Sequence, residues 1–161
     1  MVCPNAKPGR ILVVDDEPLI LQVLETILQG GGYSVELAGG AEQALAILAR
    51  SNFDVIITDF QMPGLKGDEF AMEVKARTPR QRIMMLTGMP EQVPALGQPP
   101  VIDIILRKPF RSQDLLQTVQ NLLNDARQDS PPSIEGHPDF SPAQLYFEFP
   151  STSSCQASLH A

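Results

Sequence analysis

Short apolar runs alternate along this 161-residue chain with longer segments in which apolar residues recur every three or four positions. Runs this apolar suit strands that are buried on both faces of a sheet, and their alternation with helical segments is typical of repeated βα units. Five runs fit strands, at residues 11–15, 34–38, 55–59, 83–86 and 102–106. The sequence therefore predicts an α/β fold with a doubly wound, five-stranded parallel sheet.

Four segments have the apolar spacing of amphipathic helices, at residues 19–29, 41–50, 67–77 and 113–124. Pro18 fits the first turn of the first helix, where its missing N–H costs nothing. The run Gly30-Gly31-Gly32 should end that helix, because glycine tolerates the left-handed backbone of a C-terminal cap. Ser112 is available as the N-cap of the last helix. The expected core face of the first helix consists of Ile20, Leu24, Ile27 and Leu28.

The segment between the fourth and fifth strands departs from this pattern. A helix is expected there, yet the segment contains Pro90, Pro94, Pro99 and Pro100. An interior proline costs a helix roughly 3 kcal/mol, so a long regular helix cannot persist. We expect a shortened fourth helix of at most one or two turns, over residues 91–96, followed by a loop.

The chain is long enough for one well-buried domain and short for two. We expect that domain over residues 10–124, between an N-terminal tail (1–9) and a C-terminal tail (125–161). Periodicity stops in the C-terminal tail, which is rich in Pro and Ser and contains 1 basic and 5 acidic side chains. This composition is typical of a disordered segment, although the aromatic stretch 144–149 could dock on the domain or on a partner.

The formal net charge of −7 opposes a general nucleic-acid binder, which needs clustered Lys and Arg to contact phosphates. No apolar run reaches the roughly 18 residues of a membrane span, and residues 1–10 lack the apolar stretch of a secretory signal. We therefore expect a cytoplasmic protein without membrane contacts. Cys3 and Cys155 lie in the two tails, where free thiols are the simplest interpretation.

Residues capable of chemistry stand at the ends of four predicted strands. Asp15 and Asp16 close the first strand, Asp59 closes the third, Thr87 follows the fourth, and Lys108 follows the fifth. In a doubly wound parallel sheet, ligands bind beyond the carboxyl ends of the strands. The fold therefore predicts that these five side chains meet at one rim.

Three carboxylates and one lysine at one rim suit a phosphorylatable aspartate with a bound Mg²⁺. This ion prefers oxygen ligands, so Asp16 and Asp59 can supply carboxylates while Asp15 acts through water. An aspartate carboxylate can attack phosphorus once a cation offsets the repulsion between two anions. Lys108 would then supply a fixed positive charge to the transferred phosphoryl group, and Thr87 a hydroxyl donor.

Each of these residues also has a purely structural explanation. Asp15 and Asp16 before a helix could be an N-cap with first-turn charge, and Asp59 could form a turn with the Met-Pro-Gly that follows. Thr87 and Lys108 are individually weak signals. Coincidence does not readily explain why these residues all stand at the carboxyl ends of four predicted strands.

On these residues, the chain resembles the receiver domain of two-component response regulators over roughly residues 10–124. The motifs are Ile11-Leu12-Val13-Val14-Asp15-Asp16-Glu17-Pro18, Asp59-Phe60-Gln61-Met62-Pro63 followed by Gly67, Thr87-Gly88, and Lys108-Pro109-Phe110. The resemblance implies the flavodoxin-like strand order 2-1-3-4-5.

By this resemblance, Asp59 would accept a phosphoryl group from a histidine of a sensor kinase or of a phosphotransfer protein. The Mg²⁺ would be held by Asp16, Asp59 and the backbone carbonyl of Gln61, with Asp15 assisting through water. Thr87 and Lys108 would bind the phosphoryl oxygens. The bond between Lys108 and the proline after it would be cis.

Two features depart from the pattern of the family. Receivers commonly carry Tyr or Phe three residues before the lysine, where this chain has Ile105. The proline-rich segment before it replaces a helix that many receivers use to dimerise, so we expect a monomer. Nothing after residue 124 resembles an effector domain, so we expect a stand-alone receiver that does not itself bind DNA.

Three functions compete on this sequence. The first is a phosphoacceptor rather than an enzyme, which relays phosphate or switches the affinity for an unknown downstream partner and loses its phosphoryl group only slowly. Leu19 and Val23, on one flank of the first helix, are candidates for docking the histidine-bearing partner. The second is a phosphohydrolase, but Gln61 stands where such enzymes usually carry an acid. The third is a phosphorylation-independent interaction module, which Ile105 favours.

Overall fold

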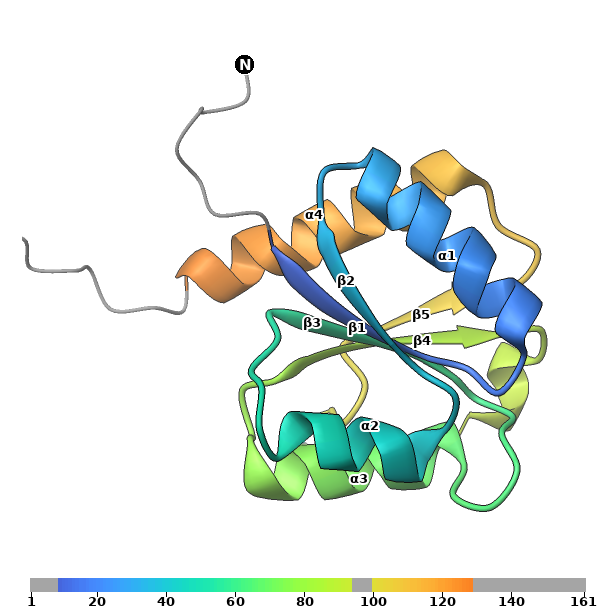
Figure 1. Ribbon diagram of the computed structural model, residues 1–161, viewed down its shortest axis with the longest axis vertical. Coiled ribbons are helices and arrows are strands. Elements are labelled where there is room, and N and C mark those ends of the chain that lie inside the picture. Colours follow the sequence, from blue (N-terminus) through green and yellow to red (C-terminus); the bar gives the residue numbers. More distant parts are fainter. Residues whose placement is uncertain (1–8, 94–99, 129–161) are drawn as a thin grey trace, which may run out of the picture. The chain divides into compact units, whose positions relative to one another are not determined.

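The computed structural model describes residues 9–93 and 100–128, which form a central sheet with helices on both faces (Figure 1). Five parallel strands pair in the order β2-β1-β3-β4-β5. This confirms both the predicted α/β class and the flavodoxin-like strand order. The strand bounds are β1 Arg10–Val14, β2 Ser34–Ala38, β3 Val55–Asp59, β4 Arg82–Thr87 and β5 Ile104–Arg107.

Two helices cover each face of the sheet. α1 and α4 pack on one face, and α2 and α3 pack on the other (Figure 1). Successive strand residues point to opposite faces, so Ile11 and Val13 of β1 enter the first core while Leu12 and Val14 enter the second. Burial on both faces is the reason why the strands are apolar throughout. The helix bounds are α1 Pro18–Gly30, α2 Ala41–Leu48, α3 Gly67–Arg77 and α4 Ser112–Gln128.

The helix ends follow their turn residues closely. α1 begins at Pro18 and its last residue is Gly30, and Gly32 just beyond it has a φ of 85°, the left-handed region that favours glycine. Both expectations for this helix are confirmed. α4 begins at Ser112 itself, so the prediction that Ser112 precedes the helix as its N-cap is wrong by one residue.

The buried face of α1 is rotated slightly from the expected one. Leu21, Leu24 and Leu28 are buried, whereas Ile20 and Ile27 are only partly buried. The three leucines are spaced by three and four positions and so lie on one stripe of the helix. The sequence offered two overlapping apolar stripes, and contact with the sheet decides between them.

In the connection between β4 and β5, the described residues form little helix, as the prolines predict. Its described part contains one 3₁₀ turn, η1 (Pro90–Gln92), and the rest of the expected helix falls on residues 94–99, outside the described residues. β5 begins two residues later than predicted. At the position before it, the Asp103 N–H donates to the carbonyl of Ile83 while the Asp103 carboxylate accepts the Ile83 N–H, so a side chain replaces the first rung of the ladder.

β5 is an edge strand and is less buried than the central strands of the sheet. Ile104 and Ile105 are 36% and 39% exposed, whereas β3 is buried along its whole length. Among the described residues, no helix is long and apolar enough to cross a membrane. The predicted C-terminal tail begins at residue 125, but α4 continues to Gln128, so that boundary is wrong by four residues. Residues 129–161 with the aromatic stretch 144–149, and both cysteines, lie outside the described residues.

Candidate functional site

The carboxyl ends of four strands bring the predicted site residues to one rim of the sheet. Asp15 and Asp16 follow β1, Asp59 is the last residue of β3, Thr87 is the last of β4, and Lys108 follows β5. All four strands run parallel, so their carboxyl ends lie at the same edge. The fold therefore places all five residues at this rim.

Lys108 is the centre of the rim. Its Nζ donates a hydrogen bond to Asp59 Oδ1 over 2.6 Å and lies 3.6 Å from Asp15 Oδ2. The longer distance is an ion pair without a hydrogen bond. One ammonium group is thus shared by two carboxylates from two neighbouring strands.

The second oxygen of Asp59 is held by the loop that follows β3. The backbone N–H of Gln61 donates to Asp59 Oδ2 over 2.7 Å. The same loop brings Gly67 so close that a Cβ there would stand 2.1 Å from the backbone oxygen of Asp59. Only glycine fits this position without backbone movement, so the start of α3 presses directly on the end of β3.

Asp15 is the most deeply buried acid of the rim, with 1% of its surface exposed. Its Oδ1 accepts the N–H of Glu17, whereas its buried Oδ2 has no hydrogen-bond donor. Burial raises the pKa of Asp15 above the usual 3.8, and the charges of Asp59 and Asp16 raise it further. The Glu17 N–H and Lys108 oppose these effects without cancelling them.

The pKa of Lys108 is also raised, but by attraction to its neighbours rather than by burial. Burial by itself would lower the pKa of Lys108, but the hydrogen bond and the charge of Asp59, reinforced by Asp15, raise it above the usual 10.5. The lysine is therefore fixed as a cation at neutral pH. The rim then carries three acidic side chains, one of them without a full set of donors, against one positive charge.

Thr87 lies at the rim, and its hydroxyl oxygen already accepts a hydrogen bond from the loop that follows β4. The side chain is 3% exposed, and its hydroxyl oxygen accepts the N–H of Met89 over 3.0 Å. The Thr87 carbonyl accepts the N–H of Lys108, which links the ends of β4 and β5. The Lys108–Pro109 bond is cis, as the resemblance implied. A backbone donor such as that of Met89 leaves no trace in a sequence, so this contact could not be foreseen.

The proposed metal ligands are brought near one another without forming a complete set of side chains. Asp16 is exposed, and among the described residues no three His, Cys, Asp or Glu side chains are close enough together to hold an ion. The predicted set contains two carboxylates, a water and the Gln61 carbonyl, so it stays a prediction. The undonated Oδ2 of Asp15 and the acidic excess fit a hard cation that prefers oxygen.

Comparison with known proteins identifies the family. A model of the response regulator receiver domain matches residues 11–120. The chain belongs to the response regulator receiver family. Receiver domains are phosphoacceptor modules of two-component signalling, which take phosphate from histidine kinases and bind Mg²⁺ at the phosphorylation site.

Individual relatives agree with this membership. Response regulator MprA of a Mycobacterium species (strain KMS) is 34% identical over 128 residues, which cover 78% of this chain and 55% of the relative. The chain thus spans about half the length of the curated relatives it matches.

Two solved structures illustrate the match in three dimensions. A receiver domain from Clostridium thermocellum has a TM-score of 0.69 at 34% identity, over 74% of this chain and 98% of that one. Response regulator TrrA of Thermotoga maritima, crystallised with Mg²⁺ and BeF, has a TM-score of 0.65 at 34% identity, over 71% and 99% of the two chains.

Proposed function

We propose that Asp59 of this chain accepts a phosphoryl group from a phosphohistidine of a sensor kinase or a phosphotransfer protein. The observation that carries the proposal is the lysine shared by two carboxylates, with Lys108 Nζ 2.6 Å from Asp59 Oδ1 and 3.6 Å from Asp15 Oδ2. A packing role would need only one acid per lysine. The extra acid suits a site that takes up further positive charge.

The transfer is a displacement at phosphorus. A carboxylate oxygen of Asp59 forms the new bond to phosphorus as the bond from phosphorus to the histidine nitrogen breaks, and the electron pair of that bond stays on the imidazole. Lys108 turns its ammonium group from the free carboxylate to the phosphoryl oxygens. The Gln61 N–H, which holds Asp59 Oδ2, fixes the orientation of the nucleophile.

A Mg²⁺ bound at the rim would offset the repulsion between the carboxylate and the incoming phosphoryl group. Asp16, Asp59 and the backbone carbonyl of Gln61 would hold it, with Asp15 acting through water. The orphaned Oδ2 of Asp15 supports this, because a cation-bound water would supply the donor that this oxygen lacks.

The switch that follows phosphorylation involves Thr87. Its hydroxyl oxygen accepts the Met89 N–H while its O–H can donate to a phosphoryl oxygen, so a shift of Thr87 toward the phosphoryl group would move the loop after β4. Ile105 stands where relatives commonly have an aromatic ring, and it is already 39% exposed. We propose that output runs through the β4–β5 connection rather than through an aromatic side chain that follows the threonine.

The histidine-bearing partner would dock on α1 beside the rim. Leu19 and Val23 are 74% and 54% exposed, which is unusual for large apolar side chains on a helix that packs on a sheet. Leu19→Asp and Val23→Asp should slow phosphotransfer from a protein donor. Labelling by a small phosphodonor should be unchanged, since that reaction needs no docking.

We further propose a monomeric and cytoplasmic regulator that loses its phosphoryl group slowly by hydrolysis and does not bind DNA through this chain. The net charge of −7 supports the last point. A gel-filtration profile that matches one chain before and after phosphorylation would support the monomer.

The first test uses the full chain, Mg²⁺ and acetyl phosphate, with intact mass as the readout. Wild type should gain one phosphoryl group, about 80 Da, only when Mg²⁺ is present, and Asp59→Ala should gain none. An established receiver labelled in parallel validates the donor. Equal labelling of Asp59→Ala would show that another residue accepts the phosphoryl group.

A phosphorylation-independent interaction module is the second candidate. The exposed Ile104 and Ile105 favour it, and so does the β4–β5 connection, whose described residues contain one 3₁₀ turn, η1, where receivers commonly form a helix. Under this alternative, a partner would bind wild type and Asp59→Ala with the same affinity, with or without acetyl phosphate. Under the leading proposal, phosphorylation changes the affinity of wild type alone.

A further inference from the structure

The end of the sheet opposite the rim carries a concentration of positive charge. Residues 75–82 contain four of the 12 Lys and Arg residues of the chain and no acid. They span the last turn of α3 and the start of β4. On a chain with a net charge of −7, such clustering needs a local explanation.

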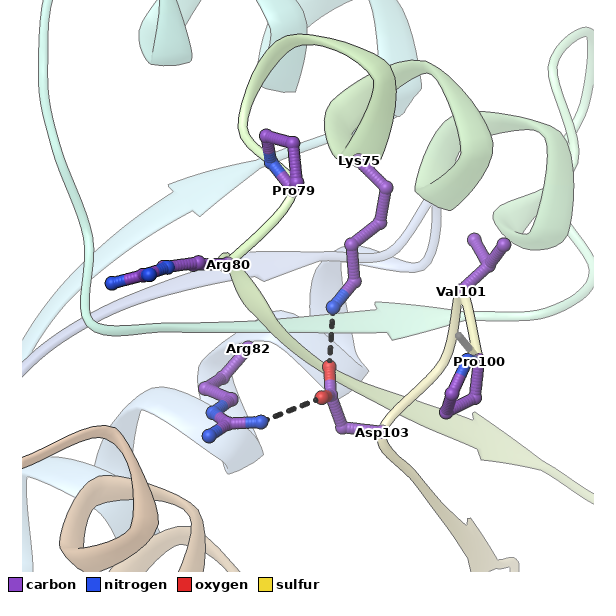
Figure 2. A pocket seen from close by; sticks show the side chains of 7 residues that line it. All are labelled: Lys75, Pro79, Arg80, Arg82, Pro100, Val101 and Asp103. Atoms are coloured by element: carbon purple, nitrogen blue, oxygen red, sulfur yellow. Dashed lines mark hydrogen bonds and ion pairs between the residues drawn. The ribbon is translucent and has the colours of Figure 1, made fainter. Parts of the chain in front are cut away.

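A hollow of about 430 Å³ opens among these residues, between the end of α3 and the starts of β4 and β5 (Figure 2). Lys75, Arg80 and Arg82 line it with Asp103 as the one acid, which leaves a net charge of +2. The remaining wall is apolar and consists of Pro79, Pro100 and Val101. Its volume lies within the roughly 300–1,000 Å³ of small-molecule sites.

Asp103 holds two of these cations in place. Its carboxylate accepts Lys75 Nζ over 2.9 Å, Arg82 Nη1 over 3.1 Å and the backbone N–H of Ile83 over 2.8 Å (Figure 2). The two cationic side chains are only 14% and 23% exposed. A lysine carries three N–H donors, so one carboxylate does not exhaust those of Lys75. The hollow therefore has preordered donors on its wall.

A structural explanation covers only part of the cluster. Lys75 and Arg77 stand in the last turn of α3, where cations compensate the helix dipole, and Arg77 also pairs with Glu73. Arg80 lies beyond the helix, is exposed, and lines the hollow. Helix stabilisation gives no reason for a cation at that position.

We propose that this hollow binds a small organic phosphate. Arginine and lysine pair with phosphate through charge-assisted hydrogen bonds, and Lys75, Arg80 and Arg82 all line this hollow. Pro79, Pro100 and Val101 offer the organic part an apolar surface. Because β4 runs from Arg82 here to Thr87 at the rim, this site and the Asp59 rim lie at opposite ends of the same strand, and the proposal does not depend on phosphorylation of Asp59.

The test is a titration of the ¹⁵N-labelled full chain with ADP, pyrophosphate or adenosine, without Mg²⁺, followed by amide chemical shifts. ADP should shift the amides of Lys75, Arg80, Arg82 and Asp103 saturably, and pyrophosphate should do so more weakly. Adenosine, which lacks phosphate, should shift none of them. Equal affinity for ADP and pyrophosphate would overturn the organic part of the proposal.

Two variants separate a built site from general charge attraction. Arg80→Ala should weaken ADP binding about 10-fold and Arg80→Glu further, because a lost charge-assisted bond to phosphate is of that order. Arg50→Ala removes the same charge from an exposed residue that does not line the hollow and should change the affinity less than about twofold. Equal loss in Arg50→Ala and Arg80→Ala, or shifts spread over basic residues elsewhere, would overturn the site.

Discussion

The two ends of the sheet are built from inverse charge arrangements. At the carboxyl end, one lysine, Lys108, is shared by two carboxylates, Asp59 and Asp15. At the amino end, one carboxylate, Asp103, is shared by two cations, Lys75 and Arg82. β5 runs between them, with a charged side chain of each network next to either end.

The difference between the two networks lies in how completely the central group is satisfied. Asp103 receives three donors, one of them a backbone N–H. Asp15 keeps a buried oxygen without a donor, and burial raises its pKa. A satisfied buried charge stabilises the fold, whereas an unsatisfied one costs stability that is tolerated where a ligand is bound. The comparison therefore marks the carboxyl end as the functional rim and Asp103 as the structural anchor of β5.

The largest effect on stability is expected at the tightest contact of the rim. Gly67→Ala would place a Cβ 2.1 Å from the Asp59 carbonyl oxygen, with other backbone atoms near 3 Å, so no flexible side chain can move aside. We expect the free energy of unfolding to fall by about 3 kcal/mol in a urea titration. Gly30→Ala, in open space at the end of α1, should leave it unchanged or slightly higher.

Asp103→Asn tests the anchor at the amino end. The change leaves Lys75 and Arg82 without their shared counter-charge in a mostly buried setting. We expect the free energy of unfolding to fall by about 2 kcal/mol. An unchanged unfolding midpoint would show that Asp103 does not anchor β5.

The same chemical change at the carboxyl end should have the opposite sign. Asp15→Asn keeps an oxygen for the Glu17 N–H and removes a buried charge that repels Asp59 and Asp16. We expect the free energy of unfolding to rise by roughly 1 kcal/mol, the order of one unmade hydrogen bond. Asp16→Asn, at an exposed position, is the matched control and should change it less. Destabilisation by Asp15→Asn would contradict the inverse-network comparison.

The gain from Asp15→Asn should depend on pH in a defined direction. The pKa of Asp15 is raised in the folded protein above the usual 3.8, so folding is penalised only while Asp15 is ionised. The advantage of the variant should be full at neutral pH, shrink as the pH falls through the raised pKa, and vanish below about 3.8. Parallel urea titrations of both proteins between neutral pH and pH 4 would measure this. If the stability gain of the variant stays constant over this range, it does not arise from the ionisation of Asp15.

The smallest effect is expected from the exposed pair at the amino end. Arg77 and Glu73 are 60% and 39% exposed, so solvent screens their attraction. Arg77→Ala should change the free energy of unfolding by less than about 0.5 kcal/mol. It therefore serves as the control that assigns the Asp103→Asn effect to the partly buried network rather than to any charge near the end of α3.

The rim could be predicted from sequence because each of its residues follows an apolar run. Once Asp59 and Lys108 stand at carboxyl ends of parallel strands, the topology alone brings them together. The anchor could not be predicted in the same way. Asp103 was assigned to the interior of a strand at 102–106, and its partners Lys75 and Arg82 are far from it in sequence and look like ordinary surface charges.

Other errors have the same physical origin in contacts between distant segments. The core face predicted for α1 omits Leu21, which the sheet buries, while Ile20 and Ile27 pack against the same core but are only partly buried. The Met89 N–H, which donates to the hydroxyl oxygen of Thr87, is a further contact that the sequence does not reveal, and it leaves the predicted O–H donor of Thr87 in place. Periodicity reports which residues can be buried, and only packing decides which of them are.

The most direct test of the account is a Mg²⁺ titration of the ¹⁵N-labelled full chain, because unmet negative charge at the carboxyl end is its central claim. The account predicts saturable shifts confined to the amides near Asp16, Asp59, Gln61 and Lys108. They should be lost or strongly weakened in Asp59→Ala and retained in Glu36→Gln, which removes an acid on β2 away from the strand ends. Shifts of equal size in wild type and Asp59→Ala, or none at millimolar Mg²⁺, would contradict it.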